Sequence, residues 1–374
     1  MVQKLSKIGA LPSQLIREMT EAGFITGAEQ KNIRPSSLDL SISDEVYEVE
    51  GIFQPRPGES IRDLLKLIQK KKHSLESPLL KGKMYLARLS ESLKLPKHVY
   101  GYCNPKSTSG RLDTHVRVLA DGVPRYDAVT PEGFSGELWI VILPNSFSVK
   151  MLPGQTLSQV RFFTGDTRFD ELRFEIAMER YRLLWRKKRE IPLAYDELKI
   201  RDNDGSAILT LGLTDEVLGY RCRVKDPDMV LDLSKIGYYR PEDFFEPFQC
   251  EDGYLSLKRG EFYILSTNEA VRVPPELACE MVPMDERSGD FRSHYAGFID
   301  PGWGFGKEGE GKGKPLTLEV RPFEDLIVRH QQPIAKIRFE HMIEIPDMSY
   351  DALDSNYLKQ DGPKLAKQFL SPEN

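Results

Sequence analysis

The length, composition and charge of the chain exclude several classes of protein. Its 374 residues, 40% of them hydrophobic, are enough for two domains with a core each. Lys and Arg (52) are nearly balanced by Asp and Glu (57), so no global basic field favours duplex nucleic acid. No apolar run reaches the length of a membrane span, and the N-terminal sequence lacks the apolar core of a signal peptide. We therefore expect a cytoplasmic protein that binds neither nucleic acid nor membranes.

The N-terminal part predicts one short helix and then a strand. Within residues 11–29, Leu15, Ile16 and Met19 share one helical face, and Gly23 gives a stop signal. The leucines that follow alternate with polar residues, which is the period-2 sign of a half-buried strand.

The rest of the chain is organised around short strands. Residues 61–77 predict a second helix, with a basic end at a Lys-Lys-Lys-His run. From residue 79 onward, short apolar segments are separated by Pro, Gly and Asn, which is typical of a β-sandwich, jelly roll or barrel. Residues 178–194 are basic and helix-like, and we take residues 178–198 as a linker between two β-rich regions.

The second β-rich region repeats the first. The matching pairs, at a shift of 178 and later 177 residues, are Tyr85 and Tyr263, Glu91 and Glu269, Pro105 and Pro283, and Arg161 and Arg338. Two copies of one β-domain explain this pattern. We expect a first domain over residues 1–177 and a second over 199–345. Residues 346–374 are expected to form a polar tail that is either an arm or loosely ordered.

Several other motifs are not expected to carry chemistry. Residues 306–313 have the spacing of a phosphate-binding loop, but Gly313 replaces the required Ser or Thr, so a mobile hairpin loop is expected instead. The six histidines form no zinc-binding pattern, and no zinc is expected. The four cysteines are widely spaced and are interpreted as small buried hydrophobic residues.

Each copy carries a basic, hydroxyl-containing segment after the shared proline. The residues are Lys106, Ser107 and Arg111 in the first copy and Arg287, Ser288 and Arg292 in the second. Guanidinium, ammonium and hydroxyl groups donate hydrogen bonds to phosphate oxygens. Such a string is also compatible with a solvated loop, but its recurrence at the same place in both copies favours an anion site.

Glu319 places one carboxylate in the otherwise apolar segment 316–320. A strand carboxylate often points outward to solvent. If Glu319 instead faces the segment of Ser288 and Arg292, it can take a proton from water, with its charge and orientation set by a neighbouring cation.

These motifs together resemble the dCTP deaminase family of the dUTPase-like β superfamily. The resemblance rests on the segments I-R-P-S-S-L-D-L, K-S-T-S-G-R, R-S-G-D-F-R, A-G-F-I-D-P-G-W and T-L-E, and covers most of residues 11–162 and 255–342. The tandem copies resemble the long bacterial form. The resemblance implies a mainly β fold of two tandem dUTPase-like domains, β-clip or jelly-roll-like, with a short N-terminal helix.

The resemblance also implies roles for residues of the second copy. Glu319 is expected to activate water without zinc, while Ser288 and the backbone at Ala296 position that water. Arg292 is expected to steady Glu319, and Arg287 to contact phosphate.

In the first copy the resemblance places four residues on a phosphate-binding segment, namely Lys106, Ser107, Thr108 and Arg111. Mg²⁺ would accompany the triphosphate of the substrate rather than occupy a dedicated protein site. Family active sites lie between subunits, so the resemblance implies a homo-oligomer, expected to be a trimer.

The sequence departs from the family pattern in both copies. The second copy has Gly289-Asp290 where the family has Ser-Leu, and the first copy has Val141 where the second has Glu319. We therefore expect the second copy to perform the chemistry. The first copy would complete sites at an interface or serve a structural role.

The implied reaction is hydrolytic deamination of dCTP to dUTP and ammonia. One alternative is a dUTP pyrophosphatase, or an enzyme with both activities, in which the substrate-binding residue Asp300 would direct water at the α-phosphate. Another alternative is a nucleotide-binding regulator without catalytic activity. Base preference depends on pocket shape and is not set by these motifs.

Overall fold

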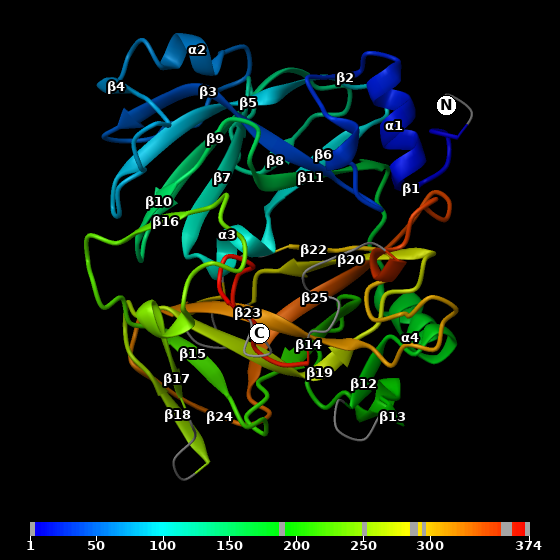
Figure 1. Ribbon diagram of the computed structural model, residues 1–374. Coiled ribbons are helices and arrows are strands. Elements are labelled where there is room, and N and C mark those ends of the chain that lie inside the picture. Colours follow the sequence, from blue (N-terminus) through cyan, green and yellow to red (C-terminus); the bar gives the residue numbers. More distant parts are fainter. Residues whose placement is uncertain are drawn as a thin grey trace. The chain divides into compact units, whose positions relative to one another are not determined.

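The computed structural model describes residues 4–186, 191–248, 253–284, 291–293 (backbone only), 297–352 and 361–370. The chain divides into two compact units, one formed by Met1–Asp166, Val224–Tyr239 and Lys367–Asn374 and the other by Thr167–Arg223 and Arg240–Ala366. Both units consist mainly of strands (Figure 1), which confirms the expected mainly β class. None of the helices in the described ranges is long and apolar enough to cross a bilayer.

The first unit begins with the predicted helix, α1 (Ser13–Glu21). Leu15, Ile16 and Met19 are fully buried, as their shared face indicates. The helix ends where Gly23 adopts a φ of 76°, a conformation that glycine enters without steric strain.

The strands of the first unit form one large sheet with the order β7-β9-β5-β3-β11-β6-β8. Its strands are β1 (Gly9–Ala10), β2 (Ile25–Thr26), β3 (Leu38–Val49), β4 (Lys70–His73), β5 (Met84–Lys94), β6 (Tyr100–Pro105), β7 (Thr114–Ala120), β8 (Ala128–Val129), β9 (Ser135–Pro144) and β11 (Thr156–Thr164). A separate pair joins β10 (Ser148–Lys150) to β16 (Val230–Asp232), and the short helices are η1 (Gln30–Asn32), α2 (Ile61–Leu64) and α3 (Ser107–Arg111).

The helix predicted over residues 61–77 is wrong for most of its length. Only α2 is helical, and the basic run forms strand β4, which pairs antiparallel with β3. The lysines Lys70–Lys72 are exposed on this edge strand. Lysines on an edge strand keep it from pairing with other chains, and pairing with β3 outweighs the local helical tendency.

The second unit contains three sheets. These are β13-β12-β19-β15-β17 with β23 beside β19 and β21 beside β23, then β14-β25-β20-β22, and finally β18-β24. The strands are β12 (Leu184–Arg186), β13 (Ile191–Pro192), β14 (Ser206–Thr210), β15 (Gly219–Cys222), β17 (Phe245–Phe248), β18 (Tyr254–Leu257), β19 (Tyr263–Val271), β20 (Leu277–Val282), β21 (Phe291–Ser293), β22 (Phe298–Ile299), β23 (Lys314–Pro322), β24 (Leu326–Arg329) and β25 (Pro333–His341). The helices are α4 (Glu171–Tyr181), η2 (Tyr195–Glu197), η3 (Pro241–Asp243) and η5 (Tyr350–Ala352).

The structural repeat starts earlier than the sequence repeat. Helix α4 and strand β12 correspond to α1 and β2, because β12 pairs with β19 at Val271 just as β2 pairs with β5 at Leu93. Phe174 and Met178 of α4 are buried like the equivalent residues of α1. Residues 178–181 and 184–186 of the predicted linker are therefore parts of α4 and β12, the first helix and the first strand of the second unit.

An equivalent tyrosine in each unit holds the turn that leads into a strand, Tyr85 for β5 and Tyr263 for β19. The hydroxyl of Tyr85 accepts a hydrogen bond from the backbone N–H of Leu80 at 2.9 Å, and that of Tyr263 accepts from Lys258 at 2.8 Å. Each bond closes a turn of five residues before the strand. The repeat seen in the sequence thus preserves hydrogen bonds as well as apolar positions.

A buried glutamate joins two strands in each unit. Glu91 accepts hydrogen bonds from the backbone N–H of Ser41, and Glu269 accepts from the N–H of Thr210 at 2.7 Å. Both amides lie next to a shift of strand register, and at such an irregularity the glutamate side chain accepts the backbone hydrogen bond. In the first unit, burial raises the pKa of Glu91 to about 7, although the hydrogen bond from Ser41 opposes this rise.

Two of the four cysteines, Cys103 and Cys279, are buried as predicted. Cys222 is half-buried, and Cys250 lies outside the described residues.

The C-terminal tail packs onto the protein at Gln368. This residue is buried, and its side chain donates a hydrogen bond to the carbonyl of Leu233 at 3.1 Å. The tail is therefore held as an arm within residues 361–370 and is not loosely ordered there.

We predict that Glu91→Gln flattens the pH dependence of stability. A folded-state pKa of about 7, above the ordinary value of 4.5, means that the protonated carboxyl favours the folded state. This contribution is complete below about pH 4.5 and is lost as the pH rises through 7, by up to about 3 kcal/mol. Urea unfolding between pH 4.5 and 7.5 measures it. An unchanged slope in the variant contradicts the assignment.

Candidate functional site

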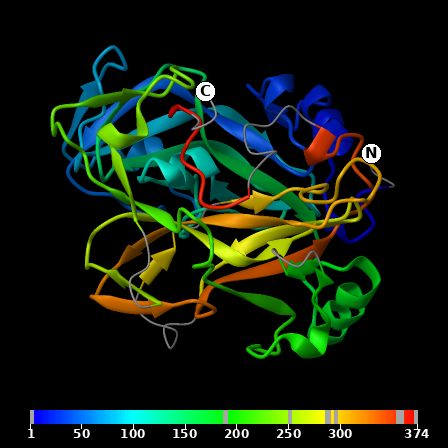
Figure 2. The same ribbon diagram turned by 60° about the horizontal axis from the view of Figure 1, so that its bottom comes forward.

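Glu319 lies in the middle of strand β23 and is only 1% exposed. Its neighbours Leu318 and Val320 are fully buried, and it stands opposite Ile264 of β19. The two strands run side by side, orange beside yellow, in Figure 2. The carboxylate is therefore not directed into bulk solvent, which excludes the ordinary interpretation of a polar residue on the outer face of a strand.

The strand that carries Arg292 is the other neighbour of β23. The backbone of Arg292 pairs with Arg321, and that of Ser293 pairs with Val320, the residue next to Glu319. Residues 291–293, at the end of the segment predicted to bind an anion, thus lie beside the strand of the carboxylate. Arg287, Ser288 and Ala296, and the side chain of Arg292, lie outside the described residues.

The expected turn at Asp300 is formed. The carbonyl of Asp300 accepts from the N–H of Trp303 at 3.1 Å, and Asp300 itself is 6% exposed. Gly302 has a φ of 93°, and a side chain there would lie 1.9 Å from the hydroxyl of Ser349. Only glycine meets both requirements, so the Asp-Pro-Gly sequence fixes the backbone of this turn.

The loop after this turn is held in place, contrary to the expected free hairpin. Arg272 donates to the carbonyl of Gly309 at 2.8 Å and to that of Gly311 at 2.9 Å, and its guanidinium lies 4.3 Å from the ring centre of Phe305. A strand, β23, follows Gly313. A phosphate-binding loop would lead into a helix, so this loop is not of that type.

In the first unit, Lys106 and Arg34 surround one buried carboxylate. The ammonium of Lys106 donates to Asp39 Oδ2 at 2.5 Å and to the hydroxyl of Thr156 at 2.9 Å. Arg34 contacts the same oxygen through Nε at 2.9 Å and Nη2 at 2.8 Å. Asp39 is fully buried. Its other oxygen, Oδ1, has no hydrogen-bond partner within the part of the chain that the structure describes.

Lys367 adds a third cation to this group from the far end of the chain. Burial lowers its pKa, and repulsion by Lys106 and Arg34 lowers it further while Asp39 opposes the change. We call Arg34, Lys106 and Lys367 around Asp39 the cation cluster. Arg34 and Lys106 alone carry two positive charges against the single negative charge of Asp39, and this excess suits an anion.

The other residues predicted for the phosphate segment belong to the same turn of chain. Lys106 directly precedes α3, which contains Ser107, Thr108 and Arg111. Ser107 and Thr108 are half-buried, whereas Arg111 is only 3% exposed. The four predicted residues are therefore brought together, with the hydroxyls more open than the guanidinium.

Val141 occupies in the first unit the place that Glu319 occupies in the second. Val141 stands opposite Leu86, and Glu319 stands opposite Ile264, the residue that repeats Leu86. Val141 belongs to an apolar cluster with Leu86 and Trp139, onto which Ile61 and Leu65 pack from the α2 segment. The first unit thus fills the position of the carboxylate with hydrocarbon.

Some residues of the site had no usable signal in the sequence. Arg34 and Asp39 lie in the segment I-R-P-S-S-L-D-L. This segment resembles the family pattern, but the resemblance implies no role for either side chain. Lys367 follows a polar tail and carries no motif. Only the folding of the C-terminal segment onto the first unit brings it to Lys106.

Comparison with known proteins gives matches over both halves of the chain. The N-terminal domain model of 2'-deoxycytidine 5'-triphosphate deaminases matches residues 7–166, and the C-terminal domain model of the same proteins matches residues 184–369. A crystal structure of 2'-deoxycytidine 5'-triphosphate deaminase from Agrobacterium tumefaciens is 32% identical, with a TM-score of 0.80. The match covers 90% of this chain and 99% of that one.

Two curated relatives match over a shorter length. A dCTP deaminase, dUMP-forming, from Methanothermobacter thermautotrophicus is 28% identical over 132 residues, which are 34% of this chain and 62% of that protein. A dCTP deaminase from Caldivirga maquilingensis is 29% identical over 132 residues, again 34% of this chain and 68% of that protein. The chain thus spans less than two thirds of the first of these relatives.

We predict that Val141→Glu destabilises the protein and creates no second active site. The new carboxylate would be buried among apolar side chains, at a cost of more than about 3 kcal/mol. Val141→Ala removes only two methyl groups and should cost about 2 kcal/mol. Urea unfolding compares the two variants. A stable Val141→Glu protein that restores turnover to a variant lacking Glu319 contradicts the prediction.

Proposed function

Because this chain belongs to the dCTP deaminase family, we propose that it catalyses the hydrolytic deamination of dCTP to dUTP and ammonia. The observation that best supports a catalytic role, and not only nucleotide binding, is the burial of Glu319 beside the strand of Arg292. The carboxylate stands in an otherwise apolar strand, between the fully buried Leu318 and Val320.

In the proposed reaction, Glu319 acts as the general base and no zinc is needed. It takes a proton from a water molecule, and the resulting hydroxide attacks C4 of cytosine. The tetrahedral intermediate then collapses as the exocyclic nitrogen receives that proton and leaves as ammonia. The second proton of that water moves from the new oxygen on C4 to N3, which gives the uracil base of dUTP, and Glu319 returns to its ionised state.

The remaining roles follow the family pattern. We assign positioning of the water to Ser288 and the backbone of Ala296, orientation of Glu319 to Arg292, and contact with phosphate to Arg287. Asp300 is assigned to substrate binding, supported by its fixed and buried place in the turn.

The cation cluster of the first unit is our candidate for an anion subsite. Its excess positive charge, together with Ser107, Thr108 and Arg111, suits the phosphate groups of a nucleotide. Mg²⁺ would enter with the triphosphate. The unpartnered Oδ1 of Asp39 fits one contact of the kind this ion makes when phosphates and water supply the rest.

The assembly and location of the enzyme are also proposals. The family places its sites between subunits, so we propose a homo-oligomer, a trimer, located in the cytoplasm. Light scattering of the purified protein measures the subunit number directly. A monomer that is fully active rules out a site shared between subunits.

A second candidate is an enzyme that also hydrolyses dUTP to dUMP and pyrophosphate. The dUMP-forming name of the relative from Methanothermobacter thermautotrophicus favours it. In that case Asp300 would direct water at the α-phosphate.

The purified protein should release one ammonia per dCTP consumed, and dCMP and CTP should be turned over more slowly. Ammonia measured by a coupled assay, with nucleotides separated by ion-exchange chromatography, tests this. Accumulation of dUTP supports deamination alone, whereas dUMP with pyrophosphate supports the second candidate. Binding of dCTP with no product contradicts both enzymatic proposals.

Glu319→Gln should lower kcat by about 10² to 10⁴ while leaving the KM for dCTP little changed. The amide keeps the size of the side chain but cannot accept the proton. Glu324→Gln is the matched control, because Glu324 is exposed just beyond the end of β23. Steady-state ammonia release gives both constants, and wild-type turnover in Glu319→Gln excludes this residue as the base.

A further inference from the structure

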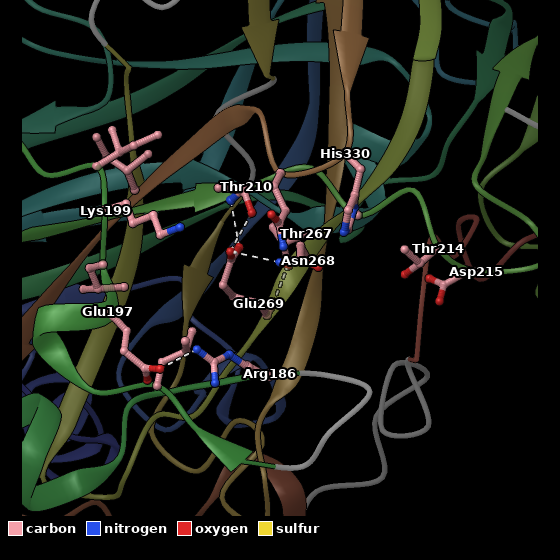
Figure 3. A pocket seen from close by; sticks show the side chains of 16 residues that line it. Arg186, Glu197, Lys199, Thr210, Thr214, Asp215, Thr267, Asn268, Glu269 and His330 are labelled. Atoms are coloured by element: carbon pink, nitrogen blue, oxygen red, sulfur yellow. Dashed lines mark hydrogen bonds and ion pairs between the residues drawn. The ribbon is translucent and has the colours of Figure 1, made fainter. Parts of the chain in front are cut away.

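The second unit contains a pocket that none of the proposed chemistry uses. Its volume is about 490 Å³, and it lies between the chain that follows β12 and the ends of β14, β19 and β25. Figure 3 shows its polar lining, including Lys199, Thr210, Glu269 and His330. This volume is within the range of small-molecule sites.

At the same place in the first unit the chain packs more closely. There Gly27, the residue after β2, packs against the backbone of β5. A Cβ atom at this position would lie 2.1 Å from the carbonyl oxygen of Ser90. Asn32 then donates to the hydroxyl of Ser41 at 3.0 Å. In the second unit the residue at the position of Gly27 is Arg186, which cannot approach so closely, and the chain from there to β14 is longer than its counterpart.

The wall of the pocket holds a carboxylate without a counter-charge. Glu269 is 8% exposed and accepts from the N–H of Thr210 at 2.7 Å, from the hydroxyl of Thr210 at 2.5 Å and from Asn268 at 3.3 Å. A carboxylate has roughly four acceptor positions, so about one remains. Over the described ranges Glu269 forms no ion pair.

An ammonium without a counter-charge lies across the pocket. Lys199 extends its side chain toward Glu269 in Figure 3, yet it forms no ion pair within the described part of the chain. The neighbouring Arg186 and Glu197 neutralise each other at 2.5 Å. Lys199 and Glu269 are thus opposite charges that share a pocket but are too far apart to pair.

His330 supplies a neutral donor at the other side of the pocket. Its Nδ1 accepts a hydrogen bond from the backbone N–H of Leu213 at 3.2 Å. The neutral ring therefore carries its hydrogen on Nε2. That N–H can bond a polar group of a ligand.

We propose that this pocket binds a small zwitterion of the α-amino acid class with a polar side chain. The ammonium group of the ligand occupies the remaining acceptor position of Glu269, and its carboxylate pairs with Lys199. The polar side chain reaches toward His330, and water fills the rest of the volume. The inference goes beyond deamination and does not rest on it.

The test uses the full-length protein and the twenty protein amino acids as probes, at millimolar concentration. At least one with a polar side chain should raise Tm in a thermal shift assay and bind at a single site by calorimetry. Lys199→Met should weaken that binding by about tenfold or more, because it removes a charge-assisted hydrogen bond. Lys94→Met, an exposed lysine of the first unit, should leave it unchanged.

A second pair of variants uses the repeat itself as a control. Glu269→Gln and Glu91→Gln remove the same strand contact in the two units, but only Glu269→Gln should abolish binding. If Glu269→Gln does not fold, the Lys199→Met result decides. The proposal is overturned if no amino acid binds, if binding survives Lys199→Met, or if ethylamine or propionate alone binds as well as the amino acid.

Discussion

The burial of one carboxylate in an apolar strand is the constraint on which the functional account depends. An isolated ionised carboxyl group removed from water costs several kcal/mol unless neighbouring groups donate to it or pair with it. In the second unit the carboxylate of Glu319 is buried, on a strand that lies next to that of Arg292. The first unit avoids the cost by placing Val141 at the same register and packing Ile61 and Leu65 over it. The two copies of one frame thus differ at this register, with a carboxylate in the second unit and an apolar side chain in the first.

That frame is held by the same bonds in both copies, and the differences lie on its surfaces. Tyr85 and Tyr263 fix equivalent strand entries, and Glu91 and Glu269 satisfy equivalent bulge amides. In the first unit, apolar side chains cover the position that corresponds to Glu319. The second unit has a longer chain after β12 and a polar pocket beside it. A tandem repeat can diverge in this way because each copy keeps its own core.

The sequence predicted those features that depend on local pattern. Helix α1 followed from an apolar face and a stop at Gly23, and the turn at Asp300 followed from its Pro and Gly. Features that depend on residues far apart in the sequence were not predicted. The lysines of β4 have no strand signal until β3 is beside them, and Lys367 joins the cation cluster only through the folded C-terminal segment. Helix α4 escaped as a repeat of α1 because buried positions, rather than residue identities, are shared.

The central claim is that Glu319 moves the proton in the conversion of dCTP. A single-turnover experiment with enzyme in excess over dCTP tests it most directly, because binding and product release no longer limit the observed rate. Formation of dUTP in rapid-quench samples is compared between the wild-type protein and Glu319→Gln, with dCTP binding to each measured by calorimetry. The account predicts similar binding and a loss of the dUTP-forming phase in the variant. An unchanged dUTP-forming phase in Glu319→Gln contradicts it.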